Sequence, residues 1–138
     1  MIEEKEFDKW NEIKKKIQQS NKIWTIKPRE IYWVKIGKNI GYEMYGKDEE
    51  FLRPVLILKR FNKYSFLGIP LTSIEKNNDF YVKVTPYKKD KKSFVIISQI
   101  RFFSTKRIKS KFSKISQQEF ENILEKVSKI VMPQRGAS

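Results

Sequence analysis

Short β-rich segments follow one another through the middle of the chain, and this succession limits its possible folds more than any other feature. The segments are EIYWVKI at 30–36, PVLILKR at 54–60, YSFLGIPL at 64–71, FYVKVTP at 80–86 and SFVIISQIRFF at 93–103. Alternating or continuous apolar runs separated by polar turns are typical of strands. Pro70 lies near the end of the third run and predicts an edge position or a bulge there. The series favours a compact, strongly bent antiparallel barrel.

Amphipathic helices are predicted at both ends of this β-rich region. At the N-terminal end, residues 3–20 carry Phe7, Trp10, Ile13 and Ile17 at helical spacing. At the other end, Ser116 and Glu119 have the spacing of a capping box. An apolar helical stripe follows from Phe120 to Val131, and Pro133 ends it. The predicted fold class is therefore mainly β, with one helix before the strands and one after them.

The length of 138 residues suits one domain. We expect an N-terminal helical extension over residues 1–22, a barrel domain with its C-terminal helix over 23–132, and a tail over 133–138. Cysteine is absent, the first ten residues are acidic and polar, and no apolar run approaches the ~20 residues of a membrane span. These features predict a cytoplasmic protein without a membrane partner.

The charge balance indicates a polyanionic partner. Thirty Lys and Arg residues against sixteen Asp and Glu give a net charge of +14. A surface adapted only for solubility would carry comparable numbers of both signs. Nucleic acid is the favoured partner, and an anionic membrane surface or an acidic protein are the alternatives.

Histidine is also absent, and this restricts the chemistry available to the chain. Without histidine and cysteine there is no imidazole base, no Ser-His-Asp triad and no common set of ligands for a transition metal. An enzyme with this sequence must use carboxylates, Lys, Arg, Tyr, hydroxyls and backbone amides. We therefore expect neither a metal nor a cofactor.

Several blocks, read in order, resemble the PemK/MazF family of toxins from bacterial toxin–antitoxin systems. They are EIYWVKIG, GYEMYG, FLRPVLIL, IPLTS and FVIISQIRFF, followed by the capped helix. The resemblance implies a small SH3-like barrel with appended helices. It also implies metal-independent cleavage of single-stranded RNA, in which the ribose 2′-hydroxyl attacks the adjacent phosphate and leaves 2′,3′-cyclic phosphate and 5′-hydroxyl ends. The chain departs from the compact members in its N-terminal extension and in a longer loop from Met44 to Leu52.

The same resemblance implies a set of catalytic residues. Arg53 matches the arginine of the family's Arg-Pro motif and is expected at a loop-to-strand boundary, where it would stabilise charge on the phosphate. Thr72 matches the active-site threonine at the end of a strand, with Ser73 beside it as a second hydroxyl that contacts RNA. Glu43 matches the acidic residue of a loop over the site. It could position Arg53, orient the 2′-hydroxyl or act as the base.

Further residues are candidates for RNA binding. Gln99 and Arg101 match a family strand that contributes to the RNA groove and to the dimer contact. Lys106 and Arg107 begin a basic segment, 106–114, that could follow phosphates or be purely structural. The lysine-rich segment 88–92 could also follow phosphates, but a hairpin that protects a sheet edge is the favoured interpretation.

Two other functions remain open at this stage. One is a toxin of the same fold that acts on DNA gyrase through protein contacts, and the other is a barrel that binds single-stranded nucleic acid without cleaving it. The family resemblance further implies a homodimer. The positive charge predicts a cognate antitoxin with an acidic tail.

Overall fold

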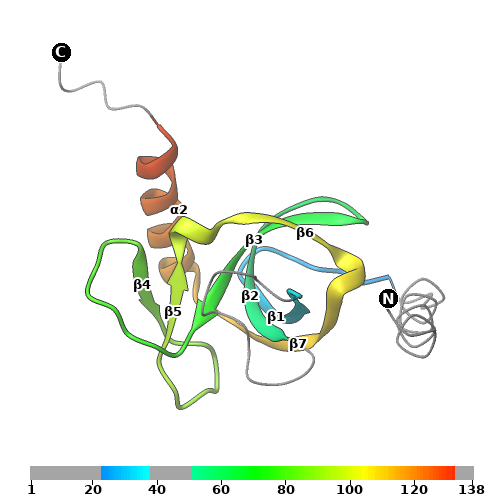
Figure 1. Cartoon of the computed structure of the whole chain (residues 1–138), viewed down its shortest axis with the longest axis horizontal. Coiled ribbons are helices and arrows are strands. Elements are labelled where there is room, and N and C mark those ends of the chain that lie inside the picture. Colours follow the sequence, from blue (N-terminus) through cyan, green and yellow to red (C-terminus); the bar gives the residue numbers. More distant parts are fainter. Residues whose placement is uncertain (1–22, 38–50, 133–138) are drawn as a thin grey trace, which may run out of the picture.

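A computed structural model describes residues 23–37 and 51–132, so the expected helix at 3–20 and the candidate residue Glu43 lie outside the described residues. Strands dominate the described part, and two 3-10 turns and one α-helix complete it (Figure 1). In chain order the elements are β1 (Glu30–Lys35), β2 (Leu52–Asn62), β3 (Ser65–Thr72), β4 (Tyr81–Val84), β5 (Ser93–Ile96), η1 (Ile97–Gln99), β6 (Arg101–Ser104), η2 (Thr105–Arg107), β7 (Ile108–Lys114) and α2 (Gln117–Val131).

The strands form one antiparallel sheet in the order β4-β5-β3-β2-β1-β7, with β6 paired to β3. The predicted fold class, mainly antiparallel β with a C-terminal helix, is confirmed. Within the described residues, however, strand pairing does not close the sheet into a barrel. Instead η2 carries the chain from β6 to β7, and the buried Thr105 holds this turn. Its Oγ1 donates to the Lys63 carbonyl at 2.9 Å, and its N–H donates to the Tyr64 carbonyl at 2.9 Å.

The last β-rich run, 93–103, was wrongly predicted as one strand. It divides into β5, η1 and β6, because β3 takes two different partners along its length. Residues 65–68 of β3 pair with β6, whereas Leu71 and Thr72 pair with β5. The edge position predicted for Pro70 is also wrong, since β3 is a central strand. Pro70 lies between the part of β3 that pairs with β6 and the part that pairs with β5. Because Pro70 pairs with neither strand, its missing N–H interrupts neither ladder.

The strand β7 was not predicted, because its sequence, IKSKFSK, carries only two large apolar residues. It pairs with β1 and completes the sheet on that side. The expected starting points of the other strands are close to those observed, although β2 begins at Leu52, before Arg53.

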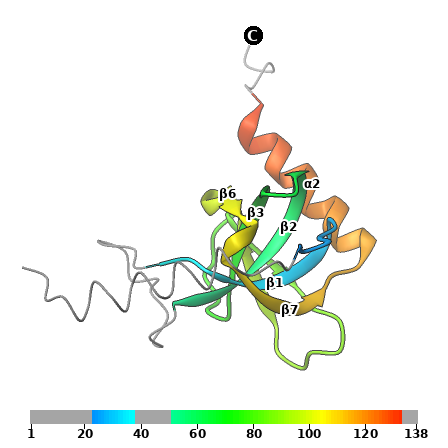
Figure 2. The ribbon, with the colours of Figure 1, turned by 90° about the vertical axis from the view of Figure 1, so that its right-hand side faces the viewer.

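The bending of the sheet creates two apolar clusters, and it explains why residues 55–58 of β2 are all buried. One cluster includes Leu56 and Ile69 and is covered by α2 through Phe120 and Ile123. The other includes Val55 and Phe66. Beyond this contact the C-terminal end of α2 extends away from the sheet (Figure 2).

The predicted capping box of α2 is confirmed. The N–H of Glu119 donates to Ser116 Oγ at 3.1 Å. Glu119 Oε2 also accepts from the N–H of Thr85 at 2.8 Å, which ties the first turn of the helix to the segment after β4.

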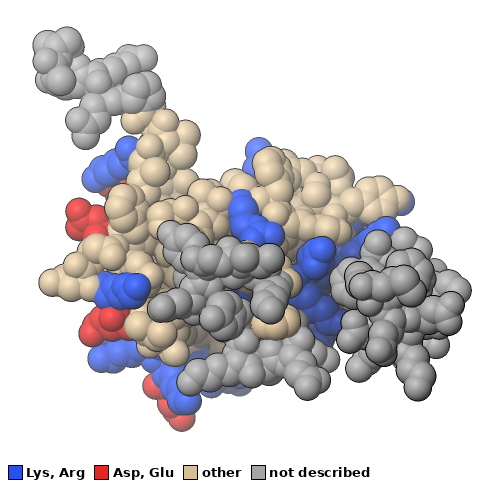
Figure 3. Space-filling model, in the orientation of Figure 1, with Lys and Arg blue, Asp and Glu red and all other residues tan. Residues whose placement is uncertain are grey.

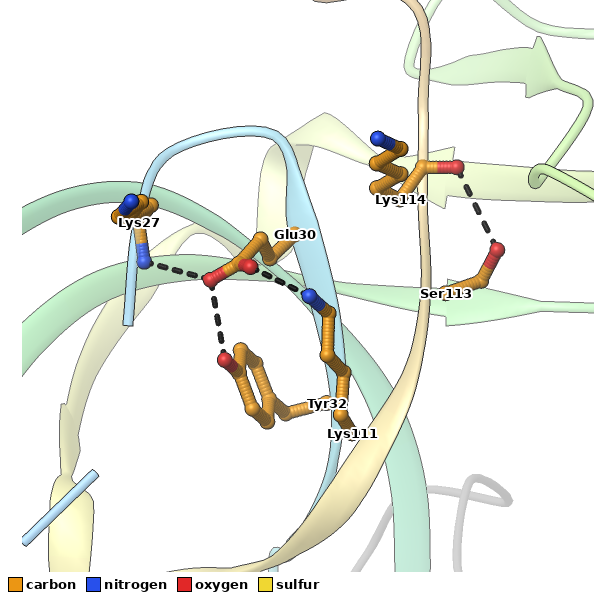
Figure 4. A network of polar contacts seen from close by, with 6 residues as sticks. All are labelled: Lys27, Glu30, Tyr32, Lys111, Ser113 and Lys114. Carbon is orange, nitrogen blue, oxygen red and sulfur yellow. Dashed lines mark hydrogen bonds and ion pairs between the residues drawn. The ribbon is translucent and has the colours of Figure 1, made fainter. Parts of the chain in front are cut away.

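The Glu30 carboxylate, at the start of β1, links the segment before β1, β1 itself and β7 (Figure 4). Glu30 Oε1 accepts from the Lys27 N–H at 2.7 Å and from the Tyr32 hydroxyl at 2.9 Å. Glu30 Oε2 accepts from Lys111 Nζ on β7 at 2.6 Å. Burial raises the pKa of Glu30, but the hydrogen bonds from Lys111, Lys27 and Tyr32 outweigh it, so the pKa is lowered. Burial and the neighbouring carboxylate raise the pKa of the Tyr32 phenol.

Candidate functional site

A pocket of about 780 Å³ lies where β2 begins and β3 ends, beside the loop between β4 and β5. Its walls combine apolar, hydroxyl and cationic side chains. The lining residues are Trp33, Leu52, Arg53, Pro54, Leu71, Thr72, Ser73, Ile74, Lys88, Lys89, Asp90, Lys91, Lys92, Ser93 and Phe112. Arg53, Thr72 and Ser73, which were singled out from the sequence, are therefore brought together in one pocket.

Strand pairing explains why Arg53 and Thr72 meet. Val55 of β2 pairs with Pro70 of β3 in an antiparallel register. Continuing this register by two residues sets Arg53 opposite Thr72. Arg53 is the second residue of β2, near the loop-to-strand boundary expected from the sequence, and it already pairs with Val34 of β1. Thr72 ends β3 as expected, and its Oγ1 accepts from the Ile74 N–H at 3.1 Å.

The Arg53 guanidinium is half-buried, and its surroundings shift its pKa. Burial lowers the pKa of Arg53, whereas the phenol oxygen of Tyr81, the first residue of β4, acts in the opposite direction. An arginine remains cationic in such a site. A partly dehydrated cation interacts more strongly with an anion than an exposed one does. Tyr81 was missed by the sequence analysis, since nothing in FYVKV distinguishes it from an ordinary strand residue.

The lysine-rich loop 88–92 is the main site feature that the sequence analysis interpreted differently. Protection of a sheet edge is the interpretation favoured from the sequence over a phosphate track, but Lys88, Lys89, Lys91 and Lys92 all line the pocket, together with Asp90. In Figure 3, basic side chains with a few acidic ones gather along the lower edge of the molecule, where this loop lies. The lysine run is visible in the sequence, but its place in the same pocket as Arg53 depends on the tertiary structure.

Four other candidates, all within the described residues, do not line this pocket. Gln99 ends η1, and Arg101 begins β6 with its guanidinium 4.7 Å from the Phe103 ring centroid. Lys106 and Arg107 are exposed in η2. A role for these four residues in RNA binding stays a prediction.

The side chains of the pocket suit an oxyanion such as phosphate. A guanidinium and two hydroxyls can donate hydrogen bonds to phosphate oxygens, and the loop ammoniums add long-range attraction. In the two described segments, no group of three acidic side chains is placed to hold a metal ion. None of the helices described there has the length and apolar character needed to cross a membrane.

The fold and the pocket together define a small, basic, mainly β protein with a site suited to anions. A family profile described as "PemK-like, MazF-like toxin of type II toxin-antitoxin system" matches residues 27–131. The chain belongs to this family, as the sequence blocks predicted.

Solved structures share the fold at low sequence identity. MazF from Deinococcus radiodurans is 16% identical with a TM-score of 0.62, over 78% of this chain and 97% of that chain. A mycobacterial endoribonuclease in complex with its cognate antitoxin is 12% identical with a TM-score of 0.60, over 80% and 99%. The Mycobacterium tuberculosis toxin MazF-mt6 is 15% identical with a TM-score of 0.58, over 77% and 100%. No curated protein sequence gives a significant match.

Proposed function

We propose that this toxin is an endoribonuclease that cleaves single-stranded RNA without a metal ion. The observation that carries the proposal is the pocket in which Arg53, Thr72 and Ser73 lie together beside four lysines. The family assignment supports it, as does the name of the similar mycobacterial structure, which is an endoribonuclease. The absence of histidine and cysteine from the sequence favours a reaction in which the RNA supplies its own nucleophile.

In the proposed reaction, the ribose 2′-oxygen bonds to the adjacent phosphorus while the bond from phosphorus to the 5′-oxygen breaks. A base takes the proton of the 2′-hydroxyl, and the departing 5′-oxygen gains a proton. Arg53 stabilises the negative charge that develops on the phosphate. Thr72 and Ser73 donate hydrogen bonds to its non-bridging oxygens. Glu43 retains the three roles that the resemblance implies: positioning Arg53, orienting the 2′-hydroxyl or acting as the base.

We also propose that the chain is a cytoplasmic homodimer, and that an antitoxin with an acidic tail inhibits it. Phe102 on β6 is 67% exposed, and Leu124 and Ile130 of α2 are exposed as well. Removing these exposed apolar side chains from water would favour association with a partner. One Deinococcus radiodurans structure is a MazE–MazF complex. The net charge of +14 favours an acidic partner over a basic one.

Incubation of the purified chain with a long unstructured RNA in excess EDTA tests the proposal. We expect cleavage with 2′,3′-cyclic phosphate and 5′-hydroxyl ends, and no cleavage where the nucleotide at the cut site is 2′-deoxy. Salt-sensitive binding without cleavage would indicate the non-catalytic alternative. Inhibition of DNA gyrase by a chain that leaves RNA intact would indicate the gyrase-directed alternative. Cleavage that EDTA abolishes would contradict the mechanism.

A further inference from the structure

We propose that the aromatic wall of the pocket, formed by Trp33 and Phe112, is a subsite that binds an unpaired base of the substrate; this rests on the proposed function. The two rings contact each other edge to face, with centroids 5.2 Å apart and planes inclined at 74°. Both line the pocket that contains Arg53 and Thr72. A pocket of about 780 Å³ has room for a nucleotide, since small-molecule sites span roughly 300–1,000 Å³.

An irregularity in β7 places Phe112 in this wall. Ser113 pairs with Ile31 of β1, and Lys111 pairs with the next residue, Tyr32, so Phe112 between them has no partner on β1. A bulge of this kind redirects a side chain and is common beside active sites. Phe112 is half-buried: it packs against the first apolar cluster and also lines the pocket.

Trp33 reaches the same wall by strand alternation. Its neighbours on β1, Tyr32 and Val34, are buried in the second apolar cluster. Trp33 pairs with Pro54, the residue after Arg53. The backbone positions of Trp33 and Arg53 are therefore close on the sheet, and both side chains line the pocket.

The lysine loop is attached to β7 in a way that holds an ammonium at the aromatic wall. The Tyr87 N–H donates to the Lys114 carbonyl at 2.8 Å, and Ser113 Oγ donates to the Tyr87 carbonyl at 2.8 Å. A turn follows, closed by the Lys89 N–H and the Pro86 carbonyl at 3.1 Å. Lys89 Nζ lies 4.9 Å from the Phe112 ring centroid.

The aromatic rings and the neighbouring Lys89 ammonium together match the base and the phosphate of one nucleotide in a single strand. A base offers a planar face to an aromatic ring, and its phosphate lies close enough for a neighbouring ammonium to neutralise it. On base binding, Lys89 moves from the ring face to the phosphate. An acidic peptide would also satisfy the lysines, but it would need an aromatic side chain of its own to use Trp33 and Phe112, whereas every nucleotide carries a planar base.

The test separates base contacts from backbone contacts and does not depend on cleavage. Binding of a single-stranded oligodeoxynucleotide of mixed sequence, which has no 2′-hydroxyl, is measured by fluorescence anisotropy beside a matched oligomer of abasic sites. Phe112→Leu keeps an apolar side chain of similar size but removes the ring, and Phe112→Tyr keeps the ring. Phe80→Leu is the matched control, because Phe80 does not line the pocket.

We expect Phe112→Leu to weaken oligodeoxynucleotide binding between about 5-fold and about 100-fold, the usual range for one base stacked on an aromatic ring. Binding of the abasic oligomer and the salt dependence should stay unchanged. Phe112→Tyr and Phe80→Leu should bind like the wild type. Wild-type affinity in Phe112→Leu, or an equal loss for the abasic oligomer, overturns the subsite. A Phe112-dependent affinity for polyglutamate, with none for the oligodeoxynucleotide, also overturns it and identifies an acidic protein as the occupant.

The same proteins tested on RNA distinguish this inference from the proposed function. If the wild type cleaves RNA and Phe112→Leu binds and cleaves as well as the wild type does, the subsite alone is wrong. If no variant cleaves RNA but the ring-dependent binding persists, the nuclease proposal alone is wrong.

Discussion

The carboxylate of Glu30 lies 2.6 Å from the ammonium of Lys111, and this contact joins the first residue of β1 to the middle of β7. The Glu30 side chain is only 14% exposed. Since strand pairing does not close the described part of the sheet, this contact is one of the side-chain links that hold the last strand, β7, against β1.

Glu30→Gln should lower the free energy of unfolding by about 1–2 kcal/mol, because it removes a charged acceptor that is largely shielded from water. Urea unfolding followed by circular dichroism measures the change. Glu125→Gln is the matched control. Its ion pair with Lys129 lies at the surface, 3.4 Å apart, and should contribute less than about 0.5 kcal/mol. Equal effects of the two substitutions would show that the Glu30 network contributes no more than a surface pair.

The contribution of Glu30 should depend on pH. Because the folded-state pKa lies below the usual value of 4.5, folding favours the ionised carboxylate. This stabilisation is fully present above the unfolded-state pKa and is lost as the pH falls through the lower folded-state pKa. The difference in urea midpoint between wild type and Glu30→Gln should therefore be largest near about pH 7 and shrink towards about pH 3. A constant difference over this range would contradict the lowered pKa.

Arg53→Ala should reduce RNA cleavage by about 100-fold or more, by analogy with the loss of one group that stabilises transition-state charge. Arg53→Lys should restore little, because lysine lacks the planar guanidinium. Arg60→Ala is the matched control: Arg60 is an exposed arginine on the same strand and does not line the pocket. Single-turnover kinetics measures the cleavage rate of each variant, and urea unfolding shows whether the variant is folded. An unchanged cleavage rate in folded Arg53→Ala would exclude the role assigned to Arg53.

The lysine loop should make a larger contribution to RNA affinity than η2 does. Replacing Lys89 and Lys91 by glutamine should reduce the slope of log affinity against log salt by about 0.7 for each phosphate that the variant no longer neutralises. Lys106→Gln with Arg107→Gln tests the candidates in η2, and exposed Lys126 on α2 provides the control. Anisotropy titrations at several salt concentrations measure the slopes. A larger change in this slope for the variant with Lys106→Gln and Arg107→Gln than for the loop variant would show that residues 106–114 are the main phosphate-binding segment.

Phe102→Glu should convert the proposed homodimer into a 16.6 kDa monomer, because it places a charge in an apolar contact. Analytical ultracentrifugation over micromolar concentrations measures the mass. Phe80→Glu, also at an exposed phenylalanine but on the other side of β5, should leave the mass unchanged. A wild-type chain that sediments only as a monomer would contradict the dimer.

The sequence alone determined the features that depend on neighbouring residues. Apolar runs indicated β1 to β5, and the capping box located the start of α2. The order of the sequence blocks identified the family, and the excess of lysine indicated an anionic partner. These signals are local because strand alternation, helix capping and charge are all properties of short stretches of chain.

The tertiary structure alone decided which distant residues share the pocket. The β2–β3 register, continued two residues beyond the Val55–Pro70 pair, sets Arg53 opposite Thr72, and the bulge in β7 places Phe112 in the same pocket. The change of partner along β3 divided the run at 93–103, and attachment to β7 brought the lysine loop over the pocket. Register, bulges and partner changes depend on pairing between segments far apart in sequence, so no local pattern specifies them.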